Sequence, residues 1–186
     1  ILIASSAQAK VQPLAETGLE LGLGYGVVKA EMPTSDGPTT LTNQMATLSV
    51  GYRFKNPDGA FSIMPRASVG QQTSTDDLHS TMLEVDDNMF GGQGHHFEIE
   101  RMTSLELVLQ LHTTDTFFVY LSPAYTRTDI KIDGPDTTLI DDTSDWNFGF
   151  GAGAGMYVND KVSLRASCMR LNNDREHYGL AIQYHF

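Results

Sequence analysis

Five charged side chains stand out because they interrupt segments in which small and apolar residues otherwise alternate. They are Glu20, Arg53, Arg66, Glu106 and Arg165. If these segments enclose a narrow interior, the charges must be paired, because an unpaired buried charge is costly. One interpretation is a gated polar conduit, and the other is a set of structural ion pairs that plugs the interior. A narrow bore favours the plug.

A second group of residues has side chains that bind metals. His95 and His96 lie near Asp86, Asp87 and Glu98 in the sequence. Adjacent histidines in a strand point in opposite directions, and these carboxylates lack the spacing of a calcium-binding EF-hand loop. We therefore predict a solvated loop and no metal site.

A third group could support hydrolysis, which needs a nucleophile, a base and an orienting acid close together. Ser80 follows His79, and His177 lies near Asp174 and Glu176. Proximity in sequence does not establish such geometry, and no His-x-Ser pattern occurs. We predict no catalytic residues and no cofactor.

Composition excludes several classes of protein. The 186 residues carry a formal net charge of −11, which argues against nucleic-acid binding because phosphate contacts need clustered Lys and Arg. Mean hydropathy is −0.22, and no run approaches the roughly 20 apolar residues of a membrane helix. Cys168 is the single cysteine, so an intrachain disulfide is impossible.

The elements that position these residues are strands, because apolar residues recur at every second position. Eight segments show this pattern: 18–27, 45–54, 61–70, 104–111, 117–126, 146–156, 162–169 and 176–186. The opposite face consists of Gly, Ala, Ser and a few charges, which suits a narrow interior better than a solvent face. Connections alternate between long and short, with long ones near 31–42, 71–98 and 131–145. We predict an all-β fold, a closed eight-stranded antiparallel up-and-down transmembrane β-barrel.

Aromatic residues provide a check, because they were not used to define the strands. With the short turns at one end, two clusters form, as expected at two membrane interfaces. Those near the short turns include Tyr52, Phe54, Phe61 and Tyr184, and those near the long loops include Tyr25, Tyr125, Trp146 and Tyr178.

Two further expectations concern residues inside the strands. Pro65 and Pro123 lack an N–H, so we expect a bulge or a strand end at each. The inward glycines of the first and sixth segments are expected to make room for Arg side chains or to leave small water-filled pockets.

The first residues resemble the end of a secretory signal. Residues 1–9 read ILIASSAQA, with an A-x-A cleavage pattern at positions 7–9. We expect residues 1–9 to be a signal remnant and residues 10–186 to form the barrel domain.

The last strand reads EHYGLAIQYHF and places Phe186 at the carboxyl terminus. A strand of this kind with a terminal Phe resembles bacterial outer-membrane β-barrel proteins. The chain is similar to the small eight-stranded group that includes the OmpA membrane domain and the OmpX/Ail and opacity-type proteins.

The resemblance implies location in the outer membrane, contact with its lipid and lipopolysaccharide, and recognition of Phe186 by the barrel-assembly machinery. It also implies a monomer with roles in envelope structure, adhesion or resistance to host defence. The long loops would carry these roles by binding a host or surface ligand. They are acidic, which suits bridging divalent cations or, more simply, solubility.

Two alternatives remain. Some small barrels of this class are lipid A-modifying enzymes. A soluble lipocalin-like barrel would instead place its apolar face inside, around a small ligand.

Overall fold

The computed structural model describes residues 17–32, 39–56, 60–74, 83–85, 88–90, 96–133, 143–171 and 175–186. Ten strands are present within these ranges. They are β1 (Gly18–Met32), β2 (Thr39–Lys55), β3 (Phe61–Ser74), β4 (Leu83–Val85), β5 (Asn88–Phe90), β6 (His96–His112), β7 (Phe117–Asp133), β8 (Thr143–Asn159), β9 (Val162–Leu171) and β10 (Arg175–His185).

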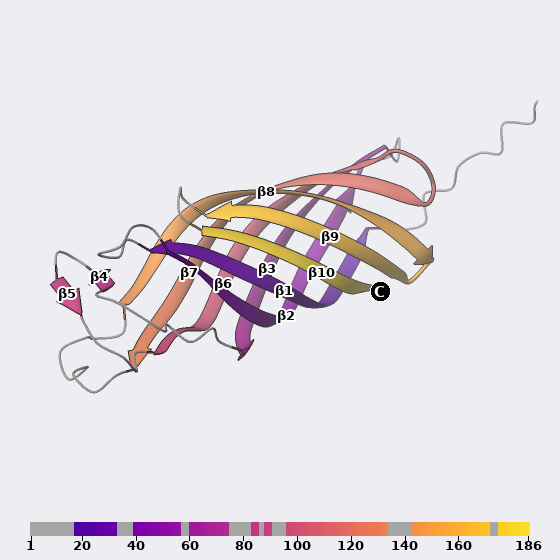
Figure 1. Ribbon diagram of the computed structural model, residues 1–186. Coiled ribbons are helices and arrows are strands. Elements are labelled where there is room, and N and C mark those ends of the chain that lie inside the picture. Colours follow the sequence, from indigo (N-terminus) through magenta and orange to yellow (C-terminus); the bar gives the residue numbers. More distant parts are fainter. Residues whose placement is uncertain are drawn as a thin grey trace, which may run out of the picture.

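Eight of the strands close into an antiparallel barrel in the order β1-β10-β9-β8-β7-β6-β3-β2 (Figure 1). Strands β1 and β10 complete the ring, with Glu20 opposite His185 and Ala30 opposite Arg175. Closure leaves no free strand edge in the wall. The predicted all-β eight-stranded barrel is confirmed.

The remaining two strands, β4 and β5, form a separate two-stranded sheet. It lies beyond the end of the barrel opposite the C-terminus (Figure 1). This hairpin falls within the stretch 71–98 that was expected to be a loop. Two wall strands are also longer than predicted. Strand β6 begins at His96 and not at residue 104, and β8 ends at Asn159 and not at residue 156.

The barrel has an apolar exterior and a polar interior. Leu23 and Leu180 are 66% and 68% exposed, whereas Ser163 and Gln183 are at most 1% exposed. This arrangement is the reverse of a soluble lipocalin-like barrel, so that alternative is wrong. Among the described residues, no helix is long and apolar enough to span a membrane.

The prediction of a bulge or strand end at each proline is wrong. Pro65 lies opposite Leu107 on β6, and Pro123 lies opposite Phe150 on β8, both inside regular pairings. Each proline also faces a second neighbouring strand, and there the pairing is interrupted without a change of register. In the β2–β3 pair, the residues between Gly51 and Phe54 have no partner. In the β6–β7 pair, the residues between Glu106 and Leu109 have none. The wall therefore tolerates a missing N–H by omitting local pairing.

An aromatic core fills the interior near the short turns. Three rings, Phe118, Tyr120 and Tyr157, pack there. They contact two apolar side chains, Met64 on β3 and Val108 on β6. The inward glycines of β8 make room for these rings rather than for Arg side chains. A Cβ on Gly155 would lie 2.2 Å from Phe118 Cζ, and one on Gly153 would lie 2.3 Å from Tyr120 Cζ.

Candidate functional site

A buried ionic cluster joins strands on both sides of the barrel closure. Glu20 on β1 contacts Arg53 on β2 through Oε2, and its Oε1 lies 3.2 Å from Arg165 Nη2 on β9. These three side chains are only 2–3% exposed. His185 Nδ1 on β10 lies 3.1 Å from Glu20 Oε2. One carboxylate is therefore shared by two guanidiniums.

Polar and aromatic side chains extend this cluster across the bore. Arg53 Nη1 donates a hydrogen bond of 2.8 Å to Tyr157 Oη, and Gln110 Nε2 donates one of 2.9 Å to the same atom. Arg165 Nη2 donates to Gln110 Oε1 at 3.0 Å. The Arg165 guanidinium also lies 5.3 Å from the centre of the Phe118 ring. We call this assembly the plug, because its side chains fill the interior near the short turns.

A second ion pair lies further along the interior. Arg66 on β3 and Glu106 on β6 are direct cross-strand partners. Arg66 Nη2 lies 2.6 Å from Glu106 Oε2, and the side chains are 12% and 6% exposed. Ser68 Oγ lies 3.4 Å from the other carboxylate oxygen.

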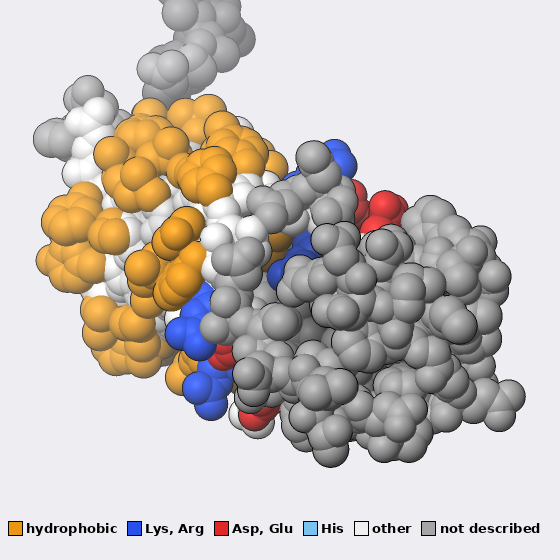
Figure 2. Space-filling view, turned by 90° about the vertical axis from the view of Figure 1, so that its left-hand side faces the viewer, with side chains coloured by type: hydrophobic (Ala, Val, Ile, Leu, Met, Phe, Trp, Pro, Cys, Tyr) orange, Lys and Arg blue, Asp and Glu red, His pale blue; other side chains and the backbone are white. Residues whose placement is uncertain are grey.

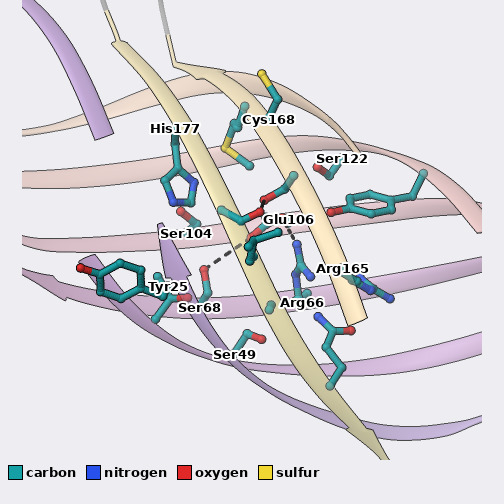
Figure 3. Close-up of a pocket in the computed structure, with 18 of the residues that line it drawn as sticks. Tyr25, Ser49, Arg66, Ser68, Ser104, Glu106, Ser122, Arg165, Cys168 and His177 are labelled. Atoms are coloured by element: carbon teal, nitrogen blue, oxygen red, sulfur yellow. Dashed lines mark hydrogen bonds and ion pairs between the residues drawn. The ribbon is translucent and has the colours of Figure 1, made fainter. Parts of the chain in front are cut away.

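A small cavity, here called the chamber, adjoins the second ion pair (Figure 3). It offers about 60 Å³ to water-sized occupants, enough for roughly four waters. Hydroxyl groups line much of it, with Ser68, Ser104 and Ser122 around the Arg66–Glu106 pair in Figure 3. The chamber is thus an interior space with hydroxyl and apolar groups in its lining, bordered by both Arg66 and Arg165.

Of the residues that the sequence analysis considered for hydrolysis, only His177 and Glu176 are among the described residues. His177 lines the chamber, but its Nε2 has no hydrogen-bond partner among the described residues. Asp174, His79 and Ser80 lie outside the described residues.

A Ser–His–Glu relay that the sequence analysis missed is present in the plug. Ser163 Oγ lies 3.0 Å from His185 Nε2, and His185 Nδ1 contacts Glu20. Ser163 is fully buried, and neither Ser163 nor His185 lines the chamber. Glu20 is also held by two guanidiniums. The relay has the contacts of a catalytic triad, but its serine is not exposed.

The metal-binding hypothesis concerns residues that are largely undescribed. Asp86, Asp87 and His95 lie outside the described residues, and the side chains of His96 and Glu98 are not described either. Among the residues that the structure does describe, no group of three His, Cys, Asp or Glu side chains could hold a metal ion.

Aromatic and basic side chains ring the outer surface near the long connections. Tyr125 and Trp146 stack with ring centres 4.9 Å apart. Lys29 Nζ lies 5.7 Å from the centre of the Tyr178 ring, and the Tyr178 hydroxyl donates to Glu176 Oε2 at 2.6 Å. On the same face, Tyr25 is 50% exposed.

Four exposed basic residues occupy this level, one on each of four strands. We call them the basic rim: Lys29, Arg101, Arg127 and Arg170. Figure 2 shows Lys, Arg, Asp and Glu side chains gathered at the edge of the hydrophobic flank. Arg127 Nε lies 2.8 Å from Asp129 Oδ1 in an exposed ion pair.

Another group of aromatic residues surrounds the opposite end of the barrel. Tyr52 and Phe54 have ring centres 4.9 Å apart, and those of Tyr184 and Phe186 are 4.8 Å apart. Phe61 is 36% exposed and Phe186 is 67% exposed. The Phe186 N–H donates to Leu19 O at 3.0 Å, which ties the last residue to β1.

A closed antiparallel barrel with an apolar exterior, exposed aromatic residues near both ends and a polar interior defines a transmembrane β-barrel. The sequence matches the family model described as the outer membrane protein β-barrel domain over residues 1–185, and the chain belongs to this family. The protein is therefore a bacterial outer-membrane protein. The sequence matches no protein with a curated description.

Solved structures of small outer-membrane barrels share the fold. The N-terminal β-barrel domain of Pseudomonas aeruginosa OprF has 15% identity and a TM-score of 0.57, covering 92% of this chain and 100% of that chain. The Yersinia pestis attachment invasion locus protein Ail has 13% identity and a TM-score of 0.56, with coverage of 92% and 100%. Neisserial surface protein A has 13% identity and a TM-score of 0.50, with coverage of 89% and 97%.

Proposed function

We propose that this protein is a non-enzymatic barrel that contributes to envelope structure and presents acidic surface loops for interaction or adhesion. The observation that carries the proposal is the distribution of charge in the sequence. Residues 31–42, 71–98 and 131–145 together contain thirteen Asp and Glu but one Lys and no Arg. Their net charge of −12 exceeds in magnitude the −11 of the whole chain.

This charge favours a cationic ligand, such as a basic protein surface, over a sulfated polysaccharide. Ail has been crystallised with the heparin analogue sucrose octasulfate. Like charges repel across an interface, so the acidic loops of this chain disfavour such an anion. The shared fold therefore supports a surface role for the loops, while their charge indicates a different ligand.

The test is binding of the protein, folded in phospholipid nanodiscs, to polylysine-coated and heparin-coated surfaces. We expect binding to polylysine that weakens with salt, because Coulomb attraction between exposed charges is screened. Replacing Asp76, Asp77, Asp86 and Asp87 by Asn should weaken it, whereas Asp115→Asn with Asp160→Asn, which removes charge from two short turns at the opposite end of the barrel, should weaken it less. Stronger binding to heparin than to polylysine would contradict the proposal.

We also propose that the basic rim binds the phosphate groups of lipopolysaccharide. The rim lies beside the exposed aromatic residues near the long connections, and such residues mark the membrane interface. Arg and Lys bind phosphate through charge-assisted hydrogen bonds. The unfolding temperature should therefore rise more in lipopolysaccharide bilayers than in phosphatidylcholine. Arg127→Gln should reduce this difference, and Lys161→Gln, in the turn between β8 and β9, should leave it unchanged.

We further propose that the barrel-assembly machinery reads Phe186. This residue is 67% exposed and directly follows β10, the strand that closes the barrel against β1. Phe186→Ala should slow insertion by the purified machinery while leaving spontaneous folding in detergent intact. Equal slowing of both processes would indicate a packing role instead.

A further inference from the structure

The membrane-spanning interior holds more positive than negative charge. Its buried ionic residues are three arginines, Arg53, Arg66 and Arg165, and two carboxylates, Glu20 and Glu106. Arg53 and Arg165 share Glu20, while Arg66 uses Glu106. At least one buried positive charge therefore lacks a balancing carboxylate among the described interior residues.

Hydrogen-bond donors are also in excess where the interior opens into the chamber. In the described part of the chain, four buried donors lack a hydrogen-bond partner, Nε and Nη1 of Arg165, Nε of Arg66 and Nε2 of Gln183, against one such acceptor on these side chains, Oε1 of Gln183. All three side chains line the chamber, and Arg165 and Gln183 are at most 3% exposed. Ser49 Oγ adds a hydroxyl beside Gln183, because a Cβ on Gly22 would lie 2.4 Å from Ser49 Oγ and 3.3 Å from Gln183 Nε2.

Arg66 and Arg165 border the same chamber, and the like charges of two guanidiniums repel each other. Water can satisfy N–H groups, but it cannot cancel a buried net charge, and low polarity strengthens the repulsion. An anion between the guanidiniums would satisfy the free donors and balance the charge at once.

We propose that the chamber binds one small inorganic anion, such as chloride, between Arg66 and Arg165. Gln183 Nε2 and the Ser49 hydroxyl complete its set of donors. The chamber of about 60 Å³ accepts a monatomic ion with a few waters and excludes bulky organic anions such as gluconate. The anion is a resident part of the polar interior and balances the ion pairs that hold the wall together.

Bromide diffraction on the wild-type protein tests the site directly. Crystals of the detergent-folded protein are grown or soaked in sodium bromide, and data are collected at the bromine absorption edge. We expect an anomalous peak inside the chamber between the two guanidiniums. An ordered chamber that contains only water, with no anomalous peak, would overturn the proposal.

Unfolding in solution gives a second measurement. The urea midpoint of the detergent-folded protein should be higher in sodium chloride than in sodium gluconate at equal ionic strength, because a ligand that binds only the folded state stabilises it. The increase should saturate with chloride concentration. Equal midpoints in the two salts over the whole range would contradict a chloride site.

A charge-supplying variant locates the ion. Gln183→Glu places a carboxylate at the chamber, so it should abolish both the chloride dependence and the bromide peak. Gln72→Glu is the matched control. Gln72 lies near the carboxyl end of β3 and does not line the chamber. Retention of the bromide peak in Gln183→Glu, or its loss in Gln72→Glu, would place the anion elsewhere and overturn the assignment. If Gln183→Glu does not fold, the wild-type bromide map decides.

Discussion

Replacing Glu20 by Gln should destabilise the barrel strongly, because Glu20 is the one carboxylate that holds both Arg53 and Arg165. The side chain is 3% exposed and both guanidiniums are 2% exposed, so solvent screens these contacts little. Removing one partner of a buried ion pair typically costs about 3–5 kcal/mol. Gln retains a carbonyl oxygen that accepts hydrogen bonds, which places the expected loss near the lower limit, at about 3 kcal/mol.

The exposed pair between Arg127 and Asp129 is the internal control. Its side chains are 44% and 25% exposed, so Asp129→Asn should change the free energy of unfolding by about 0–1 kcal/mol. Both variants and the wild type are unfolded with urea in the same detergent, and the midpoints and slopes are compared.

A double-mutant cycle separates lost pairing from lost packing. Arg53→Met leaves Glu20 with Arg165, and the double variant Glu20→Gln with Arg53→Met removes one of the two orphaned guanidiniums. The double variant should therefore lose about 1–3 kcal/mol less than the sum of the single losses. Two results together would refute the account of the plug as a charge-coupled unit. Glu20→Gln would lower the free energy of unfolding no more than Asp129→Asn does, and the losses of Glu20→Gln and Arg53→Met would add strictly in the double variant.

Three further outcomes follow from the wall and the relay. Leu107→Arg should impair folding into bilayers by about 2–4 kcal/mol, because Leu107 is an exposed, lipid-facing residue, and folding equilibria in phosphatidylcholine vesicles measure this. Gly155→Ala should cost about 1–3 kcal/mol in urea unfolding, because its Cβ would lie 2.2 Å from Phe118 Cζ and 2.6 Å from a backbone oxygen. Gly179→Ala is the control, since its nearest atom is 3.2 Å away, and equal losses at both glycines would contradict the packing argument. Ser163 should not react with a fluorophosphonate probe in the folded protein, because it is fully buried, and mass spectrometry of a labelled peptide would reveal the contrary result.

The number and facing of the wall strands could be predicted from the sequence. In a strand, successive side chains point to opposite faces, so Glu106 inward and Leu107 outward follow from period two alone. The ion pair between Arg66 and Glu106 joins strands that are consecutive in the barrel wall, and such contacts follow from strand order. The strand ends were harder to predict, because the extensions beyond the membrane, such as residues 96–103 of β6, no longer need an apolar face.

Contacts across the barrel could not be predicted, because they depend on stagger and side-chain length. Arg165 reaches Glu20 past the intervening strand β10, and strand order gives no hint of that distance. The relay between Ser163 and His185 was also missed. A signal for it does exist: both are inward positions at the ends of β9 and β10, and Ser163 pairs with Gln183 in that ladder. The glycines of β8 were assigned to the wrong neighbours for the same reason.

The pairing of β1 with β10 has a consequence for the timing of biogenesis. Strand β1 is synthesised well before β10, and its pairing with β10 cannot form until β10 has been made. The ring therefore cannot close during synthesis. Until then, the alternating strands carry apolar side chains and unpaired amides through the aqueous compartment between the two membranes, where both invite aggregation. The unfolded chain is therefore most prone to aggregation before β1 and β10 pair, whatever the stability of the finished barrel.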